Sequence, residues 1–560
     1  MVGIAVLSIM CAATAGKPRV VILSDISNEP DDQMSFVRLF TYANEIDLEG
    51  LIAVTSCWKK NDPDTATLRK LIVAYGKVYD NLKPHSPDYP AAQYLQSIVK
   101  AGVNGYGMSA AASQLDNEGV KHIVTVLEKN DPRPLWFLVW GGANTLGAAV
   151  MKIKNENAAA AEALVAKIRT YDIALQDDGS AYIMHQFPSA QLMTSRVAWR
   201  GMSHSRPGWN DSPESWGGND SVCNSAWCST NVQKAHGPLG EMYPNVMWRW
   251  EGDSPSFLYL IPNGLNFPEY KTYGGWGGRF GEERQLNIRS GSQNDSVDPL
   301  QNKQKDYSLY MEAKDTWTYK STTYTKNEYC AIFRFREDFQ NDFAARMDRC
   351  VKSFAEVNHA PRAIVNNDTT LDMIALTAKP GTDVSLDASK SIDPDNNTLS
   401  YSWFVYKEPG TYQGAVSIAG ALTSKAMVTV PSDALDKTIH VILSVRDNGS
   451  PPLIGYRRVV ITGGTPSGTI SRPRSEGLSP SAIILRPGAG RTLRVCVRSK
   501  GEFIVRVCSL DGRIEVMQRI YGRESAVISL PGIAAAHSAA VYSVMIIQGK
   551  TQVICTVTML

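Results

Sequence analysis

The chain has 560 residues, which is too long for one compact core, so we expect two to four domains. An apolar share of 43% and a charged share of 20% are typical of folded proteins and exclude a largely disordered chain. The formal net charge of +2 provides no field that would attract a nucleic acid polymer or an acidic membrane. The composition also excludes a multi-pass membrane protein, because only one apolar run could engage a bilayer.

That run is at the N-terminus, over residues 2–15, and it ends in Ala13-Thr14-Ala15. A small-x-small ending is typical of a secretory cleavage site, so residues 1–15 are predicted to be a signal peptide. The alternative is a buried first helix, because the basic residues that usually open a signal are missing. We therefore expect a secreted or cell-surface protein whose mature chain has no transmembrane segment.

Residues 17–358 alternate between short apolar runs and stretches with helical spacing. The predicted strands are Arg19–Leu23, Leu51–Val54, Leu135–Val139 and Ile173–Leu175, and the helices between them include an Ala-rich one from about Thr145 and one over 158–168. This alternation predicts an α/β domain with a mostly parallel, doubly wound sheet. Ligands of such sheets bind beyond the carboxyl ends of the strands.

From residue 361 the pattern changes to short strands of period 2 separated by turn clusters. Residues 361–463 are predicted to form an Ig/cadherin-like β-sandwich with Trp403 in its core. Residues 464–480 are rich in Gly, Ser and Pro and are predicted to be a linker. Residues 481–560 are predicted to form a second small β-sandwich, with a hairpin turn at Asp511-Gly512.

Cysteine spacing leaves the redox state open. Disulfides between Cys223 and Cys228 and between Cys330 and Cys350 fit the spacing, which by itself does not fix the pairing. No group of Cys and His has the spacing of a zinc finger.

The densest acidic segment, SDISNEPDD, follows the first predicted strand directly. Its four carboxylates, on Asp25, Glu29, Asp31 and Asp32, lie within eight residues and repel one another. A hard cation would neutralise them with oxygen ligands, and calcium tolerates irregular loops better than magnesium. A solvated helix cap is the alternative. Because the segment ends a buried strand, its position favours a calcium site.

Five segments in order carry a family resemblance: NEPDDQMSFVRLF, DLEGLIAVTS, WGGANTLGAAV, QDDGSAYI and GDSPSFLYLIPNG. They resemble the nucleoside hydrolase family and, more closely, its extracellular branch that is often labelled cellulose-binding. The resemblance covers residues 18–355 and continues into the sandwich. It implies a calcium ion at the carboxyl edge of the sheet and hydrolysis of a glycosyl bond.

The resemblance also assigns roles to single residues. It implies that Asp25, Asp32 and Asp253 ligate the calcium, together with the backbone carbonyl of Asn144, which also faces the substrate. It implies that Asp31 holds sugar hydroxyls at the catalytic centre. A histidine of the family is replaced here by Gly252.

Ser27 replaces the family aspartate that ligates calcium and activates water. A serine hydroxyl is a poor general base without a partner, so a different carboxylate is needed. Glu29 is the nearest replacement. Asp178 is a second candidate for the base and Asp177 for substrate binding, although a plain turn is an equal alternative for this pair.

Aromatic residues are dense over 199–280, and most are expected in cores. The glycine-rich loop 274–279 is a candidate to bring Trp276 and Arg279 to the pocket, where they would bind a sugar.

The final domain resembles the C-terminal sorting domains that the type IX secretion system reads. The matching stretches are EFIVRVCSLDGRIEV, ISLPGI and AVYSVMIIQGKTQVICTVTML. This resemblance implies the secretion machinery as a partner. A second carbohydrate-associated sandwich is the alternative.

Together these features predict an exported, calcium-dependent hydrolase of a saccharide or nucleoside-like substrate, using carboxylate-activated water. The alternative is a non-catalytic, cellulose-type carbohydrate-binding protein that retains the metal pocket. A weaker third interpretation is a surface adhesin in which the sandwiches do the binding.

Overall fold

The computed structural model describes residues 16–188, 190–202, 217–245, 250–281 and 310–464, and the backbone of seven strands between 483 and 559. The predicted signal peptide, the linker after Gly464 and the turn at Asp511-Gly512 lie outside the described residues. The chain divides into one unit over Lys17–Gly464 and another that contains the strands after residue 464. Among the described residues, no helix combines the length and the hydropathy that a bilayer span requires.

The first unit is built on a seven-stranded sheet with the strand order β3-β2-β1-β4-β5-β6-β7. All neighbouring strands in it are parallel. The strands are β1 Arg19–Ser24, β2 Asp47–Ala53, β3 Val99–Ala101, β4 Leu135–Val139, β5 Ile168–Ile173, β6 Gln191–Ser195 and β7 Tyr310–Met311. The predicted fold class, an α/β domain with a mostly parallel sheet, is confirmed.

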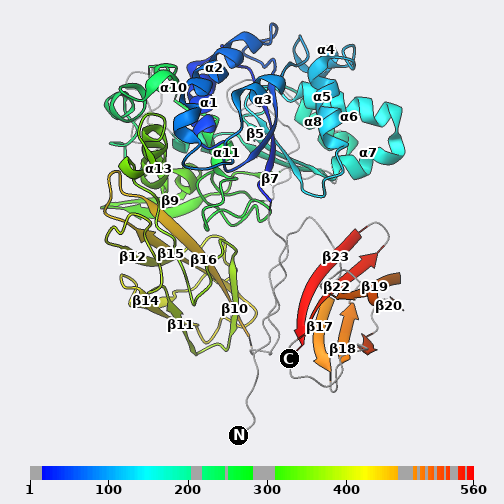
Figure 1. Ribbon diagram of the computed structural model, residues 1–560, viewed down its shortest axis with the longest axis vertical. Helices are drawn as coiled ribbons and strands as arrows, with labels where there is room; N and C mark the ends of the chain where they lie inside the picture. The colour runs from blue at the N-terminus through cyan, green and yellow to red at the C-terminus, as the bar shows by residue number, and fades with distance from the viewer. Residues whose placement is uncertain are drawn as a thin grey trace. The chain divides into compact units, whose positions relative to one another are not determined.

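Helices cover both faces of this sheet (Figure 1). Side chains alternate along β1, so that Val20 and Ile22 enter one hydrophobic core and Val21 and Leu23 enter the other. The first core includes side chains of α1 Pro30–Thr41, α2 Thr65–Leu82, α3 Ala92–Ser97, α10 Gly237–Glu241, α11 Ser254–Leu258 and α13 Arg336–Asp348. The second includes side chains of α4 Gly107–Ala111, α5 Glu118–Leu127, α6 Asn144–Glu156, α7 Ala158–Val165 and α8 Gly179–Gln186.

Short elements complete this α/β body. They are the 3₁₀ helices Ala198–Met202 and Phe354–Glu356, α9 Ser225–Cys228, the π-helical turn Ser229–Gln233, the hairpin of β8 Asp315–Tyr319 with β9 Thr322–Asn327, and α12 Cys330–Phe333.

One predicted strand, Ile173–Leu175, is wrong. The helix before it ends at Val165, and the strand runs from Ile168 to Ile173. Polar residues obscured it, because Arg169 and Asp172 are buried in this strand through bonds to Glu269 and Ser180. After Ile173 the chain leaves the sheet, because Ala174 and Leu175 adopt left-handed φ angles of 69° and 54°.

Neither predicted disulfide forms, because Cys223, Cys228, Cys330 and Cys350 are all free thiols. The thiol of Cys223 is directed to the Asp220 carbonyl at 3.5 Å, and that of Cys350 to the Arg346 carbonyl at 3.7 Å. Each of these two thiols is thus held within its own segment.

The sandwich packs a sheet of order β10-β16-β15-β12 on a sheet of order β11-β14-β13. Its strands are β10 Ile374–Ala378, β11 Asp383–Asp387, β12 Ser400–Val405, β13 Ser417–Ala419, β14 Lys425–Thr429, β15 Thr438–Arg446 and β16 Ile454–Gly463. Trp403 is buried in its core. Arg458 of β16 is buried too, and donates to the Leu265 carbonyl at 3.0 Å and the Gly274 carbonyl at 2.9 Å, which belong to the α/β body. The sandwich and the α/β body are therefore in direct contact.

The second unit also contains two antiparallel sheets, with orders β17-β18-β21 and β20-β19-β22-β23. The strands are β17 Ile483–Gly488, β18 Thr492–Val497, β19 Glu502–Ser509, β20 Ile514–Tyr521, β21 Ser525–Ser529, β22 Ala540–Gln548 and β23 Thr551–Met559.

Candidate functional site

The strand order of the parallel sheet reverses between β1 and β4, and a small cavity lies at the carboxyl ends of these strands. Its volume is about 30 Å³, which is enough for an ion and one or two water molecules. The cavity is lined by Asp25, Glu29, Asp31, Asp32, Trp58, Trp140, Ile173, Ala174, Gln176, Trp199, Gly252 and Asp253.

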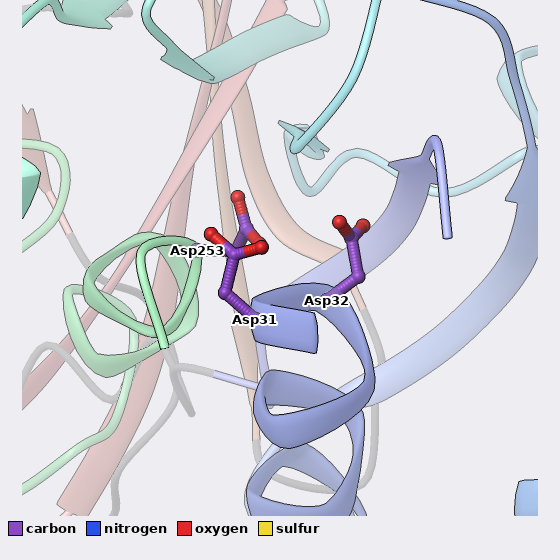
Figure 2. Close-up of side chains that lie close together, drawn as sticks. All are labelled: Asp31, Asp32 and Asp253. Atoms are coloured by element: carbon purple, nitrogen blue, oxygen red, sulfur yellow. The ribbon is translucent and has the colours of Figure 1, made fainter. Parts of the chain in front are cut away.

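Three aspartates dominate this cavity. Asp31 and Asp32 lie in the first turn of α1, and Asp253 is the N-cap residue of α11 (Figure 2). One carboxylate oxygen from each lies within 4.8 Å of the others, and all three residues are at most 7% exposed. We call these three residues the carboxylate cluster.

Serine hydroxyls direct the carboxylates that follow β1. The Ser24 hydroxyl donates to Asp32 Oδ1 and accepts the backbone N–H of Ile26 at 3.1 Å. On the next strand connection, the Ser56 hydroxyl donates to Asp25 Oδ2 at 2.5 Å. The ends of β1 and β2 thus fix the orientation of two buried carboxylates.

A buried ion pair supports the segment that carries Asp253. Arg38 Nε of α1 lies 2.6 Å from Glu251 Oε2, and neither side chain is exposed. The Ser254 hydroxyl donates to the same oxygen at 2.8 Å. Because both charges are buried and paired, this link fixes the turn before α11 against α1.

Gly252 allows the backbone before α11 to lie close to the Asp31 carboxylate. An added Cβ at this position would lie 2.9 Å from Asp31 Oδ2 and 3.1 Å from the Trp199 ring. Gly252 therefore leaves room for the Asp31 carboxylate against the turn.

Three carboxylates of the site have raised pKa values. Burial raises the pKa of Asp25 to about 7, although the Ser56 hydrogen bond opposes this shift. Burial, and then the negative charges of neighbouring carboxylates, raise the pKa of Asp32 and Asp253 well above their usual range. Asp253 Oδ2 is buried and makes no hydrogen bond to any described residue. This donor set fits a hard divalent cation, which takes carboxylate oxygens.

Five of the predicted site residues line the cavity together: Asp25, Glu29, Asp31, Asp32 and Asp253. Asp31, which the resemblance assigned to sugar hydroxyls, lies with two expected metal ligands, whereas Asp25 lies outside that group of three.

Ser27, which the resemblance matches to the family's catalytic aspartate, is exposed and is not among the residues that line the cavity. It adopts a φ of 76°, and its hydroxyl donates to Asp64 Oδ2 at 2.5 Å. Position 27 therefore supplies no group to the cavity.

Asn144, Asp177 and Asp178, which were also predicted for the site, are not among the described residues that line this cavity. Asp177 accepts the backbone N–H of Ala143 at 2.9 Å and of Asn144 at 3.0 Å, and Asp178 accepts that of Met108 at 2.7 Å. The Asn144 amide donates to the Gly105 carbonyl at 2.8 Å. The left-handed residues after β5 redirect the chain, so these side chains stabilise the neighbouring loops instead.

Trp276 and Arg279 do not line this cavity either. Trp276 is buried and packs edge-on against Phe339 and Tyr456. Arg279 pairs with Asp315 at 2.7 Å. The glycine-rich loop lies against the sandwich, because the buried Arg458 binds the carbonyl of Gly274.

Sequence reasoning missed several cavity residues, most clearly Trp58 and Gln176. Trp58 follows β2 and is 41% exposed, so it presents an aromatic ring at the open side of the cavity. Gln176 follows β5 and donates to the carbonyl of Trp140, while its Oε1 accepts no hydrogen bond from the described residues. Their places beyond the carboxyl ends of two strands were the signal that could have found them.

Comparison with known proteins agrees with this architecture. The model of the cellulose-binding Sde182, nucleoside hydrolase-like domain matches residues 19–280, and that of the Sde0182 C-terminal domain matches residues 383–463. A solved nucleoside hydrolase-related hypothetical protein from Saccharophagus degradans, described as associated with carbohydrate metabolism, is 37% identical, with a TM-score of 0.69. The match covers 80% of this chain and 100% of that chain. The chain belongs to this Sde182 nucleoside hydrolase-like family.

Two other solved structures are more distant. The type III effector protein XopQ, complexed with adenosine diphosphate ribose, is 10% identical with a TM-score of 0.30, over 60% of this chain and 95% of that chain. The PKD domain from the KIAA 1837 protein is 26% identical with a TM-score of 0.13, over 17% of this chain and 85% of that chain. No curated protein matches the chain. The resemblance of residues 481–560 to sorting domains stays a prediction.

Proposed function

We propose that this member of the Sde182 family is an exported, calcium-dependent hydrolase that cleaves a glycosyl bond in a saccharide or a nucleoside-like molecule. The observation that carries the proposal is the carboxylate cluster, buried at the reversal of strand order with Glu29 on the same cavity. The family description, cellulose-binding, supports a carbohydrate partner and an extracellular or surface location.

The carboxylate cluster holds the calcium in this proposal, with Asp25 beside it. Carboxylate oxygens are the ligands that calcium prefers, and calcium accepts the irregular arrangement that two separate helix starts provide. When bound, the cation would polarise a water molecule and coordinate sugar hydroxyls.

The remaining cavity residues bind the substrate and move the proton. Glu29 is half-buried at the N-cap of α1 and takes the proton of the attacking water. Trp58, exposed at the open side, stacks on the sugar ring. Gln176 Oε1 accepts a sugar hydroxyl. The cavity has a volume of only about 30 Å³, which is too small for a sugar ring. The sugar ring therefore lies at the mouth of the cavity, and only the glycosyl bond that is cleaved enters it.

Turnover of nucleosides and cello-oligosaccharides, measured with and without a chelator, tests the proposal. Glu29→Gln is expected to lower kcat by about 10²–10⁴-fold while calcium binding is retained, because it removes the base and leaves the ligands. Asp32→Asn is expected to lose calcium binding in calorimetry. Asp80→Asn is the control, because Asp80 is exposed and lies outside the cavity. Turnover that neither the chelator nor Asp32→Asn changes would contradict the proposal.

A non-catalytic carbohydrate-binding protein is the second candidate. It is favoured by Ser27, which faces Asp64 and leaves the cavity without the base of the family. In that case the same assays give no turnover, and binding of cello-oligosaccharides depends on calcium and on Trp58.

Export is part of the same proposal, with residues 1–15 removed and residues 481–560 read by a type IX secretion system. Mass spectrometry of the secreted protein tests the first step. A mature N-terminus at Gly16 is expected, and an intact Met1 in the medium would contradict it.

A further inference from the structure

A groove of about 690 Å³ lies where the α/β body meets the sandwich. The β8–β9 hairpin forms one side, and strands of the four-stranded sandwich sheet form the other, including residues of β12. Its floor comes from the start of α13 and the residues just before it. The groove shares no lining residue with the cavity of the carboxylate cluster, and its volume is in the range of small-ligand sites.

Aromatic side chains line both sides of this groove. Trp317 of β8 is half-buried and stacks on Tyr319, with ring centroids 5.4 Å apart and an interplanar angle of 27°. Phe404 of β12 is half-buried on the opposite side. Partly exposed rings on two sides of an open groove suit the apolar faces of sugar rings.

The acidic groups of the groove are already paired. Asp338 forms an ion pair with Arg446 and accepts the Tyr456 hydroxyl. Glu408 accepts the Thr316 backbone N–H at 2.9 Å and lies 3.8 Å from Arg334.

The lysines at the rim are different. Lys314, Lys326 and Lys407 line the groove and are exposed, and Lys314 lies 3.8 Å from Glu328. Neither Lys326 nor Lys407 forms an ion pair with any of the residues that the structure describes. The groove therefore presents aromatic surface together with surplus positive charge.

We propose that this groove binds a segment of an acidic oligosaccharide, with the rings stacking on Trp317 and Phe404 and the carboxylates facing the lysines. A neutral glucan could use the aromatic rings but would gain nothing from the lysines. This site is separate from the proposed hydrolytic centre and requires neither calcium nor the carboxylate cluster.

Calorimetry on the full chain with hexagalacturonate and with cellohexaose tests this inference. Wild type is expected to bind hexagalacturonate more tightly, and this binding is expected to weaken between about 0.03 M and about 0.3 M salt because exposed charges are screened. The double variant Lys326→Glu/Lys407→Glu is expected to bind it about tenfold more weakly, since two attractions become repulsions. Lys379→Glu/Lys390→Glu is the matched control, on exposed lysines of the same sandwich outside the groove.

Two further variants separate the possible explanations. Trp317→Ala is expected to weaken binding of hexagalacturonate, with an unchanged unfolding temperature as the check that the hairpin still packs. Asp32→Asn is expected to leave this binding intact, so that failure of the hydrolase proposal and of this one are distinguishable. Equal affinity of wild type and the double lysine variant, tighter binding of cellohexaose, or no binding of hexagalacturonate would each overturn the inference.

Discussion

Replacing Asp253 by asparagine should stabilise the calcium-free protein and abolish its response to calcium. The cluster oxygens lie within 4.8 Å of one another, and two ionised carboxylates at that distance repel by about 3.5 kcal/mol at an effective dielectric constant of 20. Asp253 faces two such neighbours, but raised pKa values let the site take up protons and relieve part of the repulsion. We therefore expect a net gain of about 2 kcal/mol in the free energy of unfolding at about pH 8.

Thermal unfolding with and without calcium measures both effects. A gain of about 2 kcal/mol corresponds to a rise in Tm of about 2 °C for a cooperative unit as large as Lys17–Gly464. If calcium binds as proposed, wild type at a calcium concentration of about 100 times Kd should gain about 2.7 kcal/mol, whereas Asp253→Asn should gain almost nothing. Asp80→Asn should behave as wild type. A calcium-free Asp253→Asn protein that is less stable than wild type, or that keeps the full calcium shift, would refute the reasoning.

The pH dependence has a defined sign. A carboxylate whose folded-state pKa is raised contributes stability at low pH that is lost as the pH rises through the folded pKa. Asp25 has a folded-state pKa of about 7, and Asp32 and Asp253 are shifted in the same direction. Without calcium, Tm of the wild type should therefore fall between about pH 5 and pH 8, and less so in Asp253→Asn.

Three further predictions concern other parts of the molecule. Gly252→Ala should weaken calcium binding about tenfold in calorimetry, because its Cβ would lie 2.9 Å from an oxygen of Asp31. Gly281→Ala is the control and should leave the calcium affinity unchanged, because its Cβ meets nothing closer than 3.9 Å. Burial and the positive charge of Arg458 lower the pKa of His440, so the folded protein loses stability as the pH falls below about 6.5. His440→Gln should therefore reduce the fall of Tm in this range. An unchanged dependence of Tm on pH would contradict this. Arg446→Met should cost about 1 kcal/mol in urea unfolding, because the half-buried Asp338 loses its cation and keeps only the Tyr456 hydroxyl, and an unchanged free energy of unfolding would contradict this.

Local signals were enough to predict the fold class and the acidic turn. The first strand is an apolar run whose side chains enter both cores, and the acidic segment follows it directly. The rule that ligands bind at carboxyl ends then placed Asp25, Glu29, Asp31 and Asp32 correctly at one cavity. Asp253 came from the family resemblance, because no local pattern joins it to α1 across more than two hundred residues.

Residues that were predicted for the site lie elsewhere in the structure where tertiary contacts decide the direction of a side chain. Asp177 and Asp178 follow a strand, as Asp25 does, but two left-handed residues turn them towards backbone N–H groups of other loops. Trp276 stands in a glycine-rich loop that looks open in sequence, yet the sandwich covers it. Spacing carries no information about such contacts.

Because Arg458 is buried between them, the sandwich cannot be exchanged for another domain without loss of contacts in the α/β body. Its guanidinium completes the hydrogen bonding of two carbonyls that belong to the other module. Recombination that exchanged this β-module for an unrelated one would leave those acceptors buried without donors. We therefore expect the α/β body and the sandwich to be inherited together. Exchange of whole modules should be confined to positions after Gly464.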